Sequence, residues 1–445
     1  MGIMVEKIIQ FGEGNFLRGF VDWFIDNINE KGLFDGKVVV VQPIKNGLCD
    51  VLNEQDGKYN LYLRGIKDGK ETCEHTYIKS ISRAVNPYDD FDGYLALAHN
   101  KDFRFIVSNT TEAGIAYDES CLFSDKPQSS FPGKLTRLLF ERYKAGLDGF
   151  IILSCELIDN NGKELLNCVN KYIDLWNLGS EFKEWVNTQN SFCSTLVDRI
   201  VTGYPKDEAE DICKSLGYTD KLLDTAEIFH LWVIEGEHED ELPLKKAGFN
   251  VVWTDDVSPY KKRKVRILNG AHTSMVLGAI LSGLTTVLDC MNDETVSAYL
   301  STCLFKEIVP TLNQTDDTFE FANAVLERFK NPYIKHQLRS IALNSVSKFA
   351  VRVLPSISEY KKLNGIYPKC LTMSLAFLIS FYKNDNPNDI PEVMSFMKSA
   401  SPKEILANTD LWGTDISDME DEINKDLAVI DEIGAKEAMK WILLK

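Results

Sequence analysis

Short apolar runs alternate with amphipathic segments through the first half of the chain. The runs typical of buried strands lie at residues 8–11, 37–41, 103–109, 149–156, 228–234 and 249–253. Helical periodicity is clearest at about 15–29 and 134–144. Strands that alternate with helices return in the same direction, so this order predicts a mainly parallel, doubly wound α/β sheet of the Rossmann type.

Two further patterns complete the chain. Residues 58–86 alternate with a period of two around Lys67-Asp68-Gly69, which predicts a β-hairpin inserted in the α/β domain. After Asp256 the periodicity is helical to the end. A chain of 445 residues is long enough for two domains. We therefore expect an α/β, nucleotide-binding domain over 1–255 and a mostly α-helical substrate and catalytic domain over 256–445.

A glycine turn stands between the first predicted strand and the first predicted helix. Such a turn presents free backbone N–H groups to a pyrophosphate. Leu17 occupies the place of the usual third glycine, so the dinucleotide fingerprint is incomplete. The candidate cofactor-binding residues of this turn are Ile9, Gln10, Phe11, Gly12, Glu13, Gly14, Asn15 and Phe16.

Other cofactor contacts are expected at the ends of the following strands. NAD-binding units commonly carry an acidic residue after the second strand, where this chain has Gln42, which can bond a ribose without charge. Lys45 keeps the phosphorylated cofactor NADP open as an alternative. The segments Asn109-Thr110-Thr111-Glu112 and Cys155-Glu156 should reach the same crevice, beyond the C-terminal ends of the strands.

The most informative residues are Lys264, Asn269 and His272, which form a Lys-x4-Asn-x2-His array on one predicted helix. At about 100° per residue, Asn269 lies roughly 140° and His272 roughly 80° round from Lys264, so one wide stripe holds all three. A lysine, an amide and an imidazole suit proton transfer beside a developing alkoxide, as in carbonyl reduction or alcohol oxidation. The alternative is a basic helix start followed by a core helix with a buried polar pair.

Composition limits the possible partners. The hydrophobic fraction of 44% and the charged fraction of 26% are ordinary for a globular protein. A net charge of −17 argues against general affinity for nucleic acid, and an anionic substrate would need a local basic site. Neither a signal peptide nor an apolar run of membrane-spanning length is visible, so we expect no membrane association.

The ten cysteines show no CxxC pair and no regular spacing. Such cysteines are typical of reduced thiols in a cytoplasmic protein. Cys73 and His75 lie close in sequence, but two residues do not make a metal site. We therefore expect no bound metal and a cytoplasmic location.

Five ordered segments carry a resemblance to a known family. QFGEGNFLRGF, SNTTEAGI, SCELIDNNG, VDRIVTG and KVRILNGAH resemble the polyol-specific long-chain dehydrogenases and reductases, which include mannitol dehydrogenase, over roughly residues 8–350. The resemblance implies a Rossmann domain followed by a helical domain, NAD as cofactor and metal-independent hydride transfer. It also implies that Lys264, Asn269 and His272 are the catalytic residues.

The same resemblance has implications for the substrate. Asp198, in the VDRIVTG segment, would bond a substrate hydroxyl or orient the lysine. Mannitol dehydrogenases carry an asparagine where this chain has Leu157, and an arginine where it has Ser340, with Arg339 one position off. The two-amide oxyanion hole and the polyol-binding arginine therefore do not carry over, which weakens a mannitol-type function.

SNTTEAGI, SCELIDNNG and NSVSKF most resemble the branch of the family that interconverts keto-hexuronates and aldonates. Such a substrate has a carboxylate, which Arg266, Lys348 or Arg352 could receive, although each could equally form a surface or inter-domain ion pair. The alternatives are a fructuronate or mannitol-type dehydrogenase with the same catalytic residues, or a nucleotide-binding module that has lost catalysis.

Overall fold

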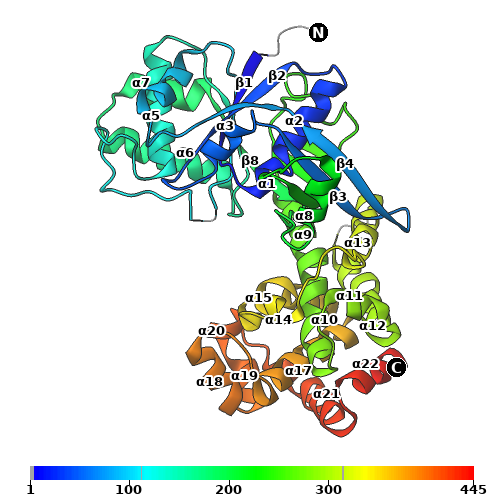
Figure 1. Cartoon of the computed structure of the whole chain (residues 1–445). Coiled ribbons are helices and arrows are strands. Elements are labelled where there is room, and N and C mark those ends of the chain that lie inside the picture. The colour runs from blue at the N-terminus through cyan, green and yellow to red at the C-terminus, as the bar shows by residue number, and fades with distance from the viewer. Residues whose placement is uncertain (1–4, 112, 313–314) are drawn as a thin grey trace. The chain divides into compact units, whose positions relative to one another are not determined.

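The computed structural model describes residues 5–111, 113–312 and 315–445 of the chain, shown in Figure 1. It divides into two compact units. Unit 1 comprises Met1–Arg64 and Thr72–Ser258, and unit 2 comprises Gly65–Glu71 and Pro259–Lys445. The division after Ser258 lies close to the boundary expected after residue 255, whereas the turn of the predicted hairpin groups with unit 2.

Unit 1 is built on an eight-stranded sheet with the order β11-β10-β8-β7-β6-β1-β2-β5. Its strands are β1 (Val5–Phe11), β2 (Gly36–Val41), β5 (Ile81–Val85), β6 (Phe105–Ser108), β7 (Ile151–Ser154), β8 (Ser191–Asp198), β10 (Leu231–Glu235) and β11 (Val251–Thr254). Neighbouring strands are parallel except β8 and β10, which are antiparallel. The run β5-β2-β1-β6-β7-β8 has the strand order of a dinucleotide-binding sheet, which confirms the predicted Rossmann-type fold.

The apolar strands form because both faces of the sheet are covered. Successive residues of a strand point to opposite faces, so Ile8 joins one core with Phe20 and Phe24, whereas Ile9 and Phe11 join a second core on the other face. The helices of unit 1 are α1 (Asn15–Arg18), α2 (Val21–Glu30), α3 (Cys49–Glu54), α4 (Phe91–Ala96), α5 (Phe131–Lys144), α6 (Asn161–Leu175), α7 (Ser180–Gln189) and α8 (Ala209–Leu216), with a 3₁₀ turn η1 (Leu97–His99). A sheet buried on both faces explains the near-continuous Val and Ile runs of its strands.

The single helix expected over 15–29 is divided into α1 and α2. Phe20 has φ −130° and ψ −77°, which lies outside the helical region. A Cβ on Gly19 would lie 3.0 Å from Cγ1 of Val201, so the chain passes close to the segment after β8 at this point. The helix therefore bends directly after Arg18, a position that the apolar periodicity alone does not reveal.

The hairpin expected over 58–86 is shorter than predicted. β3 (Tyr59–Lys67) and β4 (Lys70–Ile78) lie in a three-stranded sheet with β9 (Asp224–Glu227), whereas β5 returns to the main sheet parallel to β2. The corner between β4 and β5 is held by α2, because Lys79 N–H donates to Oδ1 of Asp26 (2.8 Å) and Ser80 Oγ donates to the Asp22 carbonyl (2.8 Å).

Unit 2 is helical, as predicted. Its helices are α9 (Ser258–Lys264), which begins at the last residue of unit 1, α10 (Gly270–Leu281), α11 (Val287–Asn292), α12 (Glu294–Thr302), α13 (Asp316–Phe329), α14 (Leu338–Ile341), α15 (Ser345–Arg352), α16 (Leu354–Asn364), α17 (Lys369–Asn384), α18 (Pro391–Ser399), α19 (Pro402–Ala407), α20 (Thr409–Trp412), α21 (Glu420–Ile433) and α22 (Ala435–Leu443). Two π turns, η2 (Val265–Asn269) and η3 (Cys303–Ile308), and two 3₁₀ turns, η4 (Val309–Thr311) and η5 (Ser417–Met419), interrupt them. Within the described ranges, no helix has both the length and the apolar character to cross a membrane.

Two carboxyl groups of unit 1, those of Asp22 and Asp224, are fully buried. Burial raises the pKa of each from 3.8 to about 7, although the nearby Arg18 guanidinium acts in the opposite direction. The folded state therefore holds these protons more tightly than the unfolded state does. This contribution to stability is fully present below pH 3.8, the ordinary pKa, and is lost as the pH rises through about 7.

We predict that the protein loses stability between pH 6 and pH 8, and that Asp22→Asn reduces this loss by about 1 kcal/mol because the amide does not titrate. Urea unfolding of both proteins at the two pH values measures the difference. Asp50→Asn, at an exposed position in α3, is the control and should keep the wild-type dependence. Equal pH dependence in wild type and Asp22→Asn would contradict the prediction.

Candidate functional site

The glycine turn lies at the C-terminal end of β1, beside β6, where the strand order of the sheet reverses. Gly12 has φ +125°, and a Cβ there would lie 2.9 Å from the Asn109 carbonyl oxygen. Only glycine fits this close approach without strain. Around Gly14, by contrast, no atom lies within 4 Å of the position that a Cβ would take, so the turn is open above it.

The turn has the hydrogen-bonding capacity that a pyrophosphate requires. The backbone N–H groups of Gly14, Asn15 and Phe16 have no hydrogen-bond partner among the described residues, as expected at the start of a helix. Helix α1 has only four residues, so the N–H groups of the turn, rather than a long helix dipole, would meet an anion. The residues present therefore fit a dinucleotide at this turn.

Three other residues predicted to bind the cofactor lie in the interior and support the turn from there. Ile9 and Phe11 are core residues of β1, and Gln10 is buried between them. Gln10 Nε2 donates to the Gly12 carbonyl and to Oδ2 of Asp22, both at 3.1 Å. These side chains hold the turn in place and do not line its open side.

Gln42 orders the loop that follows β2. Its Nε2 donates to the carbonyls of Ile44 (2.9 Å) and Lys45 (3.1 Å), and its Oε1 accepts the Cys49 N–H (3.1 Å). Both amide hydrogens are therefore used, and the predicted ribose contact could use only the remaining acceptor capacity of Oε1. Glu13 is buried against the same loop, and this burial raises the pKa of its carboxyl group.

Glu156 anchors the loop after β6 to the end of β7. Its Oε1 accepts the N–H and the hydroxyl of Thr110, and its Oε2 accepts the Ser108 hydroxyl, each at 3.1 Å. Asn109 Nδ2 donates to the Cys155 carbonyl (2.7 Å). Asn109, Thr110 and Glu156 thus lie at the same edge of the sheet as the glycine turn, whereas Glu112 lies outside the described residues.

Asp198 is the last residue of β8 and is buried in unit 1. The next residue, Arg199, is also buried, and its Nη1 donates to the Gly19 carbonyl (2.8 Å). The segment that carries Asp198 is therefore attached to the backbone directly after α1.

In unit 2, a π turn separates Lys264 from His272. Lys264 ends α9, Asn269 ends η2, and the Gly270 N–H donates to the Val265 carbonyl five residues earlier. The expected angle of roughly 140° assumed a regular α-helix from Lys264 to Asn269. This assumption is wrong, because a π turn lies there. Residues five apart lie more nearly above one another in a π turn, so the turn brings Asn269 toward the face of Lys264.

The π turn occurs where two helices approach closely. A Cβ on Gly270 would lie 3.1 Å from the Arg352 carbonyl oxygen at the end of α15. Insertions of this kind are frequent at functional sites because they re-aim side chains at the cost of helical regularity. Lys264, Asn269 and His272 are all half-buried, which suits groups that must meet a ligand.

His272 lies among aromatic rings and cations. Its ring stacks on Phe329 (centroids 4.0 Å apart, planes at 10°) and meets His336 edge-on at 5.1 Å. Its buried Nε2 has no hydrogen-bond partner among the described residues. Burial, His336 and the nearby Arg328 and Arg352 lower the pKa of His272 well below 6.5, so the imidazole is neutral at physiological pH.

The three cations considered for a substrate carboxylate differ in their partners. Arg266 donates to Ser356 Oγ (2.6 Å), Thr311 Oγ1 (3.0 Å) and Glu359 Oε2 (3.0 Å), so its guanidinium is engaged in a structural ion pair.

Lys348 donates to the Ile341 carbonyl (2.9 Å), and burial together with nearby Arg352 lowers its pKa. No carboxylate among the described residues forms an ion pair with Arg352, and the influence of Arg352 reaches both His272 and Lys348. Arg352 is therefore the candidate best suited to a substrate anion.

The two departures from the mannitol dehydrogenase pattern lie at accessible positions. Leu157 is 63% exposed directly after Glu156. Arg339, next to Ser340, forms a two-oxygen ion pair with Asp385 (2.9 and 3.0 Å). The guanidinium of Arg339 is thus already paired with a carboxylate.

One cluster of unit 2 has ligand-type side chains. Cys303, Glu307 and Cys370 are buried within 4.8 Å of one another. Glu307, however, accepts the N–H groups of Cys370 (2.9 Å) and Leu371 (2.7 Å), and so caps the start of α17. The hydrogen bonds of this helix cap account for the buried carboxylate, and the expectation of a metal-free protein stays a prediction.

Two family models match the chain. The mannitol dehydrogenase Rossmann domain matches residues 6–246, and the mannitol dehydrogenase C-terminal domain matches residues 256–431. The chain belongs to the mannitol dehydrogenase family. This finding confirms the family resemblance and the order of a Rossmann domain followed by a helical domain.

Among relatives in this family, the altronate oxidoreductase of Bacillus subtilis (strain 168) is 44% identical over 455 residues, which cover 98% of this chain and 95% of that protein. The altronate oxidoreductase of Yersinia enterocolitica is 50% identical over 388 residues, which cover 85% of this chain and 80% of that protein. These similarities place the chain beside the keto-hexuronate branch that its motifs indicated.

Solved structures confirm the fold. A substrate-free D-sorbitol dehydrogenase superposes with a TM-score of 0.86 at 22% identity, covering 99% of this chain and 98% of that one. The Pseudomonas fluorescens mannitol 2-dehydrogenase, in a ternary complex with NAD and D-mannitol, has a TM-score of 0.72 at 23% identity, covering 99% of this chain and 95% of that one.

The structure adds residues that the sequence did not single out. Arg328, Phe329 and His336 surround His272, and they lie far enough along the chain that no spacing rule connects them. Arg18 holds the glycine turn from the interior. A buried arginine could have been suspected from QFGEGNFLRGF, because Arg18 falls on the apolar side of the predicted helix.

We predict that the His272 ring stays neutral between pH 5.5 and 8, since burial and neighbouring cations disfavour its charged form. NMR of protein labelled at histidine would follow the ring resonances, and the His272→Asn variant would assign them. A His272 signal that titrates with a midpoint at pH 6 or above would contradict this picture.

Proposed function

We propose that this protein is an NAD-dependent oxidoreductase that interconverts tagaturonate and altronate. The observation that carries the proposal is the array of Lys264, Asn269 and His272 along one π-interrupted helix, with Arg352 close to His272. The similarity to altronate oxidoreductases, at 44% identity over 98% of this chain for the Bacillus subtilis enzyme, supports this substrate class.

When bound, a nicotinamide would supply the hydride for reduction of the keto carbon. Lys264, as an ammonium, gives its proton to the oxygen on which negative charge develops, and Asn269 donates a hydrogen bond from Nδ2 to the same oxygen. In the oxidation direction, neutral Lys264 accepts the alcohol proton. A lysine and an amide thus perform the work that a metal-bound water performs in other alcohol dehydrogenases.

The neutral state of His272 defines its part in the reaction. A ring with a strongly lowered pKa is not the proton carrier, but its nitrogens can still donate and accept hydrogen bonds. Its Nε2 is buried with no protein partner among the described residues. His272 would therefore bind a substrate hydroxyl and hold the substrate in register with Lys264.

Arg352 and Lys348 would bind the substrate carboxylate. A half-buried guanidinium without a carboxylate partner is costly, and an anionic ligand would provide one. Lys348 lies one helical turn earlier on α15, and the positive charge of Arg352 contributes to its lowered pKa. Arg266 is held by Glu359, so we assign it a structural role.

NAD is the proposed cofactor. The mannitol 2-dehydrogenase of Pseudomonas fluorescens was solved with NAD. In this chain, the buried carboxylate of Glu13 lies against the loop after β2, close to Gln42 and Gly47. A carboxylate beside this loop would repel the additional phosphate of NADP more strongly than it would disturb NAD.

The alternatives within the family differ in substrate and not in chemistry. The position that carries the second oxyanion amide in mannitol dehydrogenases is Leu157 here, and the polyol-binding arginine is replaced by Ser340. Comparison of tagaturonate, fructuronate and fructose, each with NADH and NADPH, would distinguish these activities. Binding of nucleotide without turnover of any of them would indicate a catalytically silent module.

We predict that Lys264→Ala lowers kcat by roughly 10²–10⁴-fold, since it removes the general acid and base, while NADH affinity stays close to that of the wild type. Steady-state kinetics and NADH fluorescence titration measure the two effects. Lys262→Ala, two residues earlier on the same helix and exposed, is the matched control and should keep wild-type kcat. Near wild-type turnover of Lys264→Ala at every pH would show that the proposed mechanism is wrong.

We also predict that tagaturonate is preferred over uncharged fructose and that Arg352→Gln lowers kcat/KM for tagaturonate roughly ten- to hundredfold. A charge-assisted hydrogen bond to a carboxylate is worth about 1.5–3 kcal/mol, which sets this range.

The kcat/KM for fructose should change little in Arg352→Gln, and added salt should weaken the binding of the uronate only. Arg339→Gln, which removes an exposed ion pair of the same unit, is the control. If the wild type turns over fructose as well as or better than tagaturonate, the prediction is wrong and the activity is of the mannitol dehydrogenase type.

A further inference from the structure

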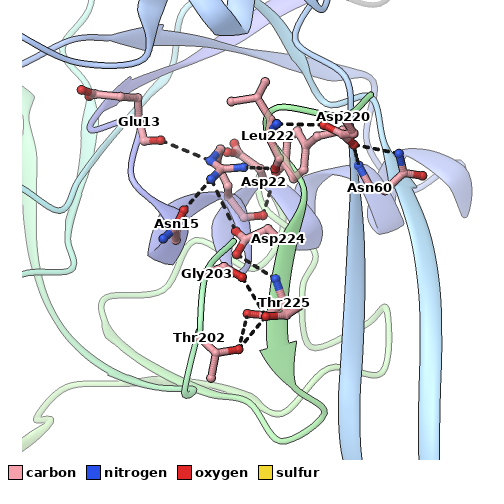
Figure 2. Close-up of polar contacts among 12 residues, drawn as sticks. Glu13, Asn15, Asp22, Asn60, Thr202, Gly203, Asp220, Leu222, Asp224 and Thr225 are labelled. Atoms are coloured by element: carbon pink, nitrogen blue, oxygen red, sulfur yellow. Dashed lines mark hydrogen bonds and ion pairs between the residues drawn. The ribbon is translucent and has the colours of Figure 1, made fainter. Parts of the chain in front are cut away.

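Arg18, the last residue of α1, is a buried cation that contacts the glycine turn. Only 2% of its surface is exposed. Its Nε donates to the Glu13 carbonyl (3.3 Å), its Nη2 donates to Asn15 Oδ1 (2.6 Å), and its Nη1 donates to the Leu222 carbonyl. Glu13, Asn15 and Leu222 are labelled in Figure 2, where dashed lines mark hydrogen bonds and ion pairs. Two of these three contacts therefore belong to the turn that would bind the nucleotide.

The direction of these contacts matters for the open side of the turn. In a planar trans peptide, the C=O of one residue and the N–H of the next point in opposite directions. Arg18 draws the Glu13 carbonyl toward the interior, and this aims the Gly14 N–H away from it. Gln10 has the same effect one peptide earlier, because its Nε2 binds the Gly12 carbonyl.

A buried guanidinium needs compensating charge. Nη2 of Arg18 lies 4.0 Å from Oδ2 of Asp224, whose other oxygen accepts the Thr225 N–H (2.9 Å). Asp22 is buried close by and accepts from Gln10. Arg18 and Gln10, the two side chains that hold the carbonyls of the turn, are thus each supported by a buried aspartate.

The same cluster reaches the segment after β8. A Cβ on Gly203 would collide with the side chain of Asn15, so glycine is required there to make room for it. The Gly203 carbonyl accepts the Thr225 hydroxyl (2.7 Å), next to Asp224. Figure 2 shows Gly203 beside Asp224 and Thr225, with Asn15 nearby. Asn15 and Thr225, which both lie against Gly203, therefore connect the cluster around Arg18 to the VDRIVTG motif.

We propose that Arg18 is a positioning residue for nucleotide binding, which acts by holding the Glu13 carbonyl inward so that the Gly14 N–H faces the pyrophosphate. The proposal rests on the function proposed above and identifies how this chain compensates for its incomplete glycine fingerprint and its four-residue first helix. Arg18 does not touch the cofactor itself. It acts through the peptide between Glu13 and Gly14.

The test is direct titration of NADH, followed by protein fluorescence, with Arg18→Gln and Arg18→Lys. Arg18→Gln should raise the Kd for NADH roughly ten- to hundredfold, as expected for the loss of one or two charge-assisted contacts. The KM for NADH should rise in parallel, whereas the KM for the keto-hexuronate and kcat at saturating NADH should change less than about threefold. Arg18→Lys keeps the charge but not the planar fork, so it should be intermediate.

Arg142 provides a matched control in the same unit. It is equally buried at 2% exposure, and its guanidinium donates to backbone carbonyls, as Nε and Nη1 of Arg18 do, among them those of Asp148 (2.9 Å) and Phe103 (3.0 Å). Arg142→Gln should lower Tm as much as Arg18→Gln does and leave the Kd for NADH unchanged. A loss of NADH affinity of similar size in both variants would reduce Arg18 to a structural residue and overturn the proposal.

Arg18→Gln leaves Asp224 without its cation and can fail to fold for that reason. The double variant Arg18→Gln/Asp224→Asn removes both charges and keeps the cluster neutral. If the double variant has a native Tm and binds NADH within about twofold of the wild type, the proposal is wrong while the proposed function stands. Failure of the wild type itself to bind NADH or NADPH would overturn the proposed function and this inference together.

Discussion

The constraint on which unit 1 depends is that every carbonyl at the C-terminal edge of β1 must find a partner away from the open side of the turn. Where a strand ends in a glycine turn, backbone N–H and C=O groups point both toward the interior and toward the open side, and each needs a hydrogen-bond partner. In this protein Gln10 donates to the Gly12 carbonyl, and Arg18 donates to the Glu13 carbonyl. Asp22 and Asp224 support these two side chains. Burial of these polar groups is less costly because Gln10 bonds to Asp22 and because Arg18 lies 4.0 Å from Asp224.

The candidate site of unit 2 depends on a different interaction, that between positive charges and the neutral His272 ring. Arg328 and Arg352 both lower the pKa of His272, and no carboxylate among the described residues pairs with Arg352. The chain as a whole carries a net charge of −17, so a guanidinium without a carboxylate among the described residues contrasts with this acidic balance. A substrate with a carboxylate would supply the missing negative charge, whereas a neutral sugar would leave it missing.

Much of the fold was predictable because it follows from local patterns. Apolar runs gave the positions of β1, β2, β6 and β7, and helical periodicity identified the second domain. The break between α1 and α2 was not predictable, since it depends on contact of Gly19 with Val201, far along the chain. The corner before β5 is held likewise by Asp26, whose side-chain carboxylate accepts the Lys79 N–H, and such a bond leaves no periodic signal in the sequence.

The candidate site shows the same limit. Spacing alone identified Lys264, Asn269 and His272, but a regular helix places Asn269 too far round, and only the close approach at Gly270 explains the π turn. The sequence could not rank Arg266, Lys348 and Arg352, because a cation's availability depends on whether another residue already neutralises it. Glu359, a distant residue in sequence, engages Arg266.

With the roles proposed above, the separation of these groups within unit 2 would allow the substrate to change without a change of chemistry. Lys264 and Asn269 lie on the segment from α9 to η2, whereas Lys348 and Arg352 lie on α15. The two segments approach each other closely at the backbone, where a Cβ on Gly270 would lie 3.1 Å from the Arg352 carbonyl oxygen. This contact involves no side chain of Arg352, so residue 352 can vary while the position of the helix is kept. A change of side chain on α15 would then alter which substrate group is bound, and the proton transfer at Lys264 would remain as it is.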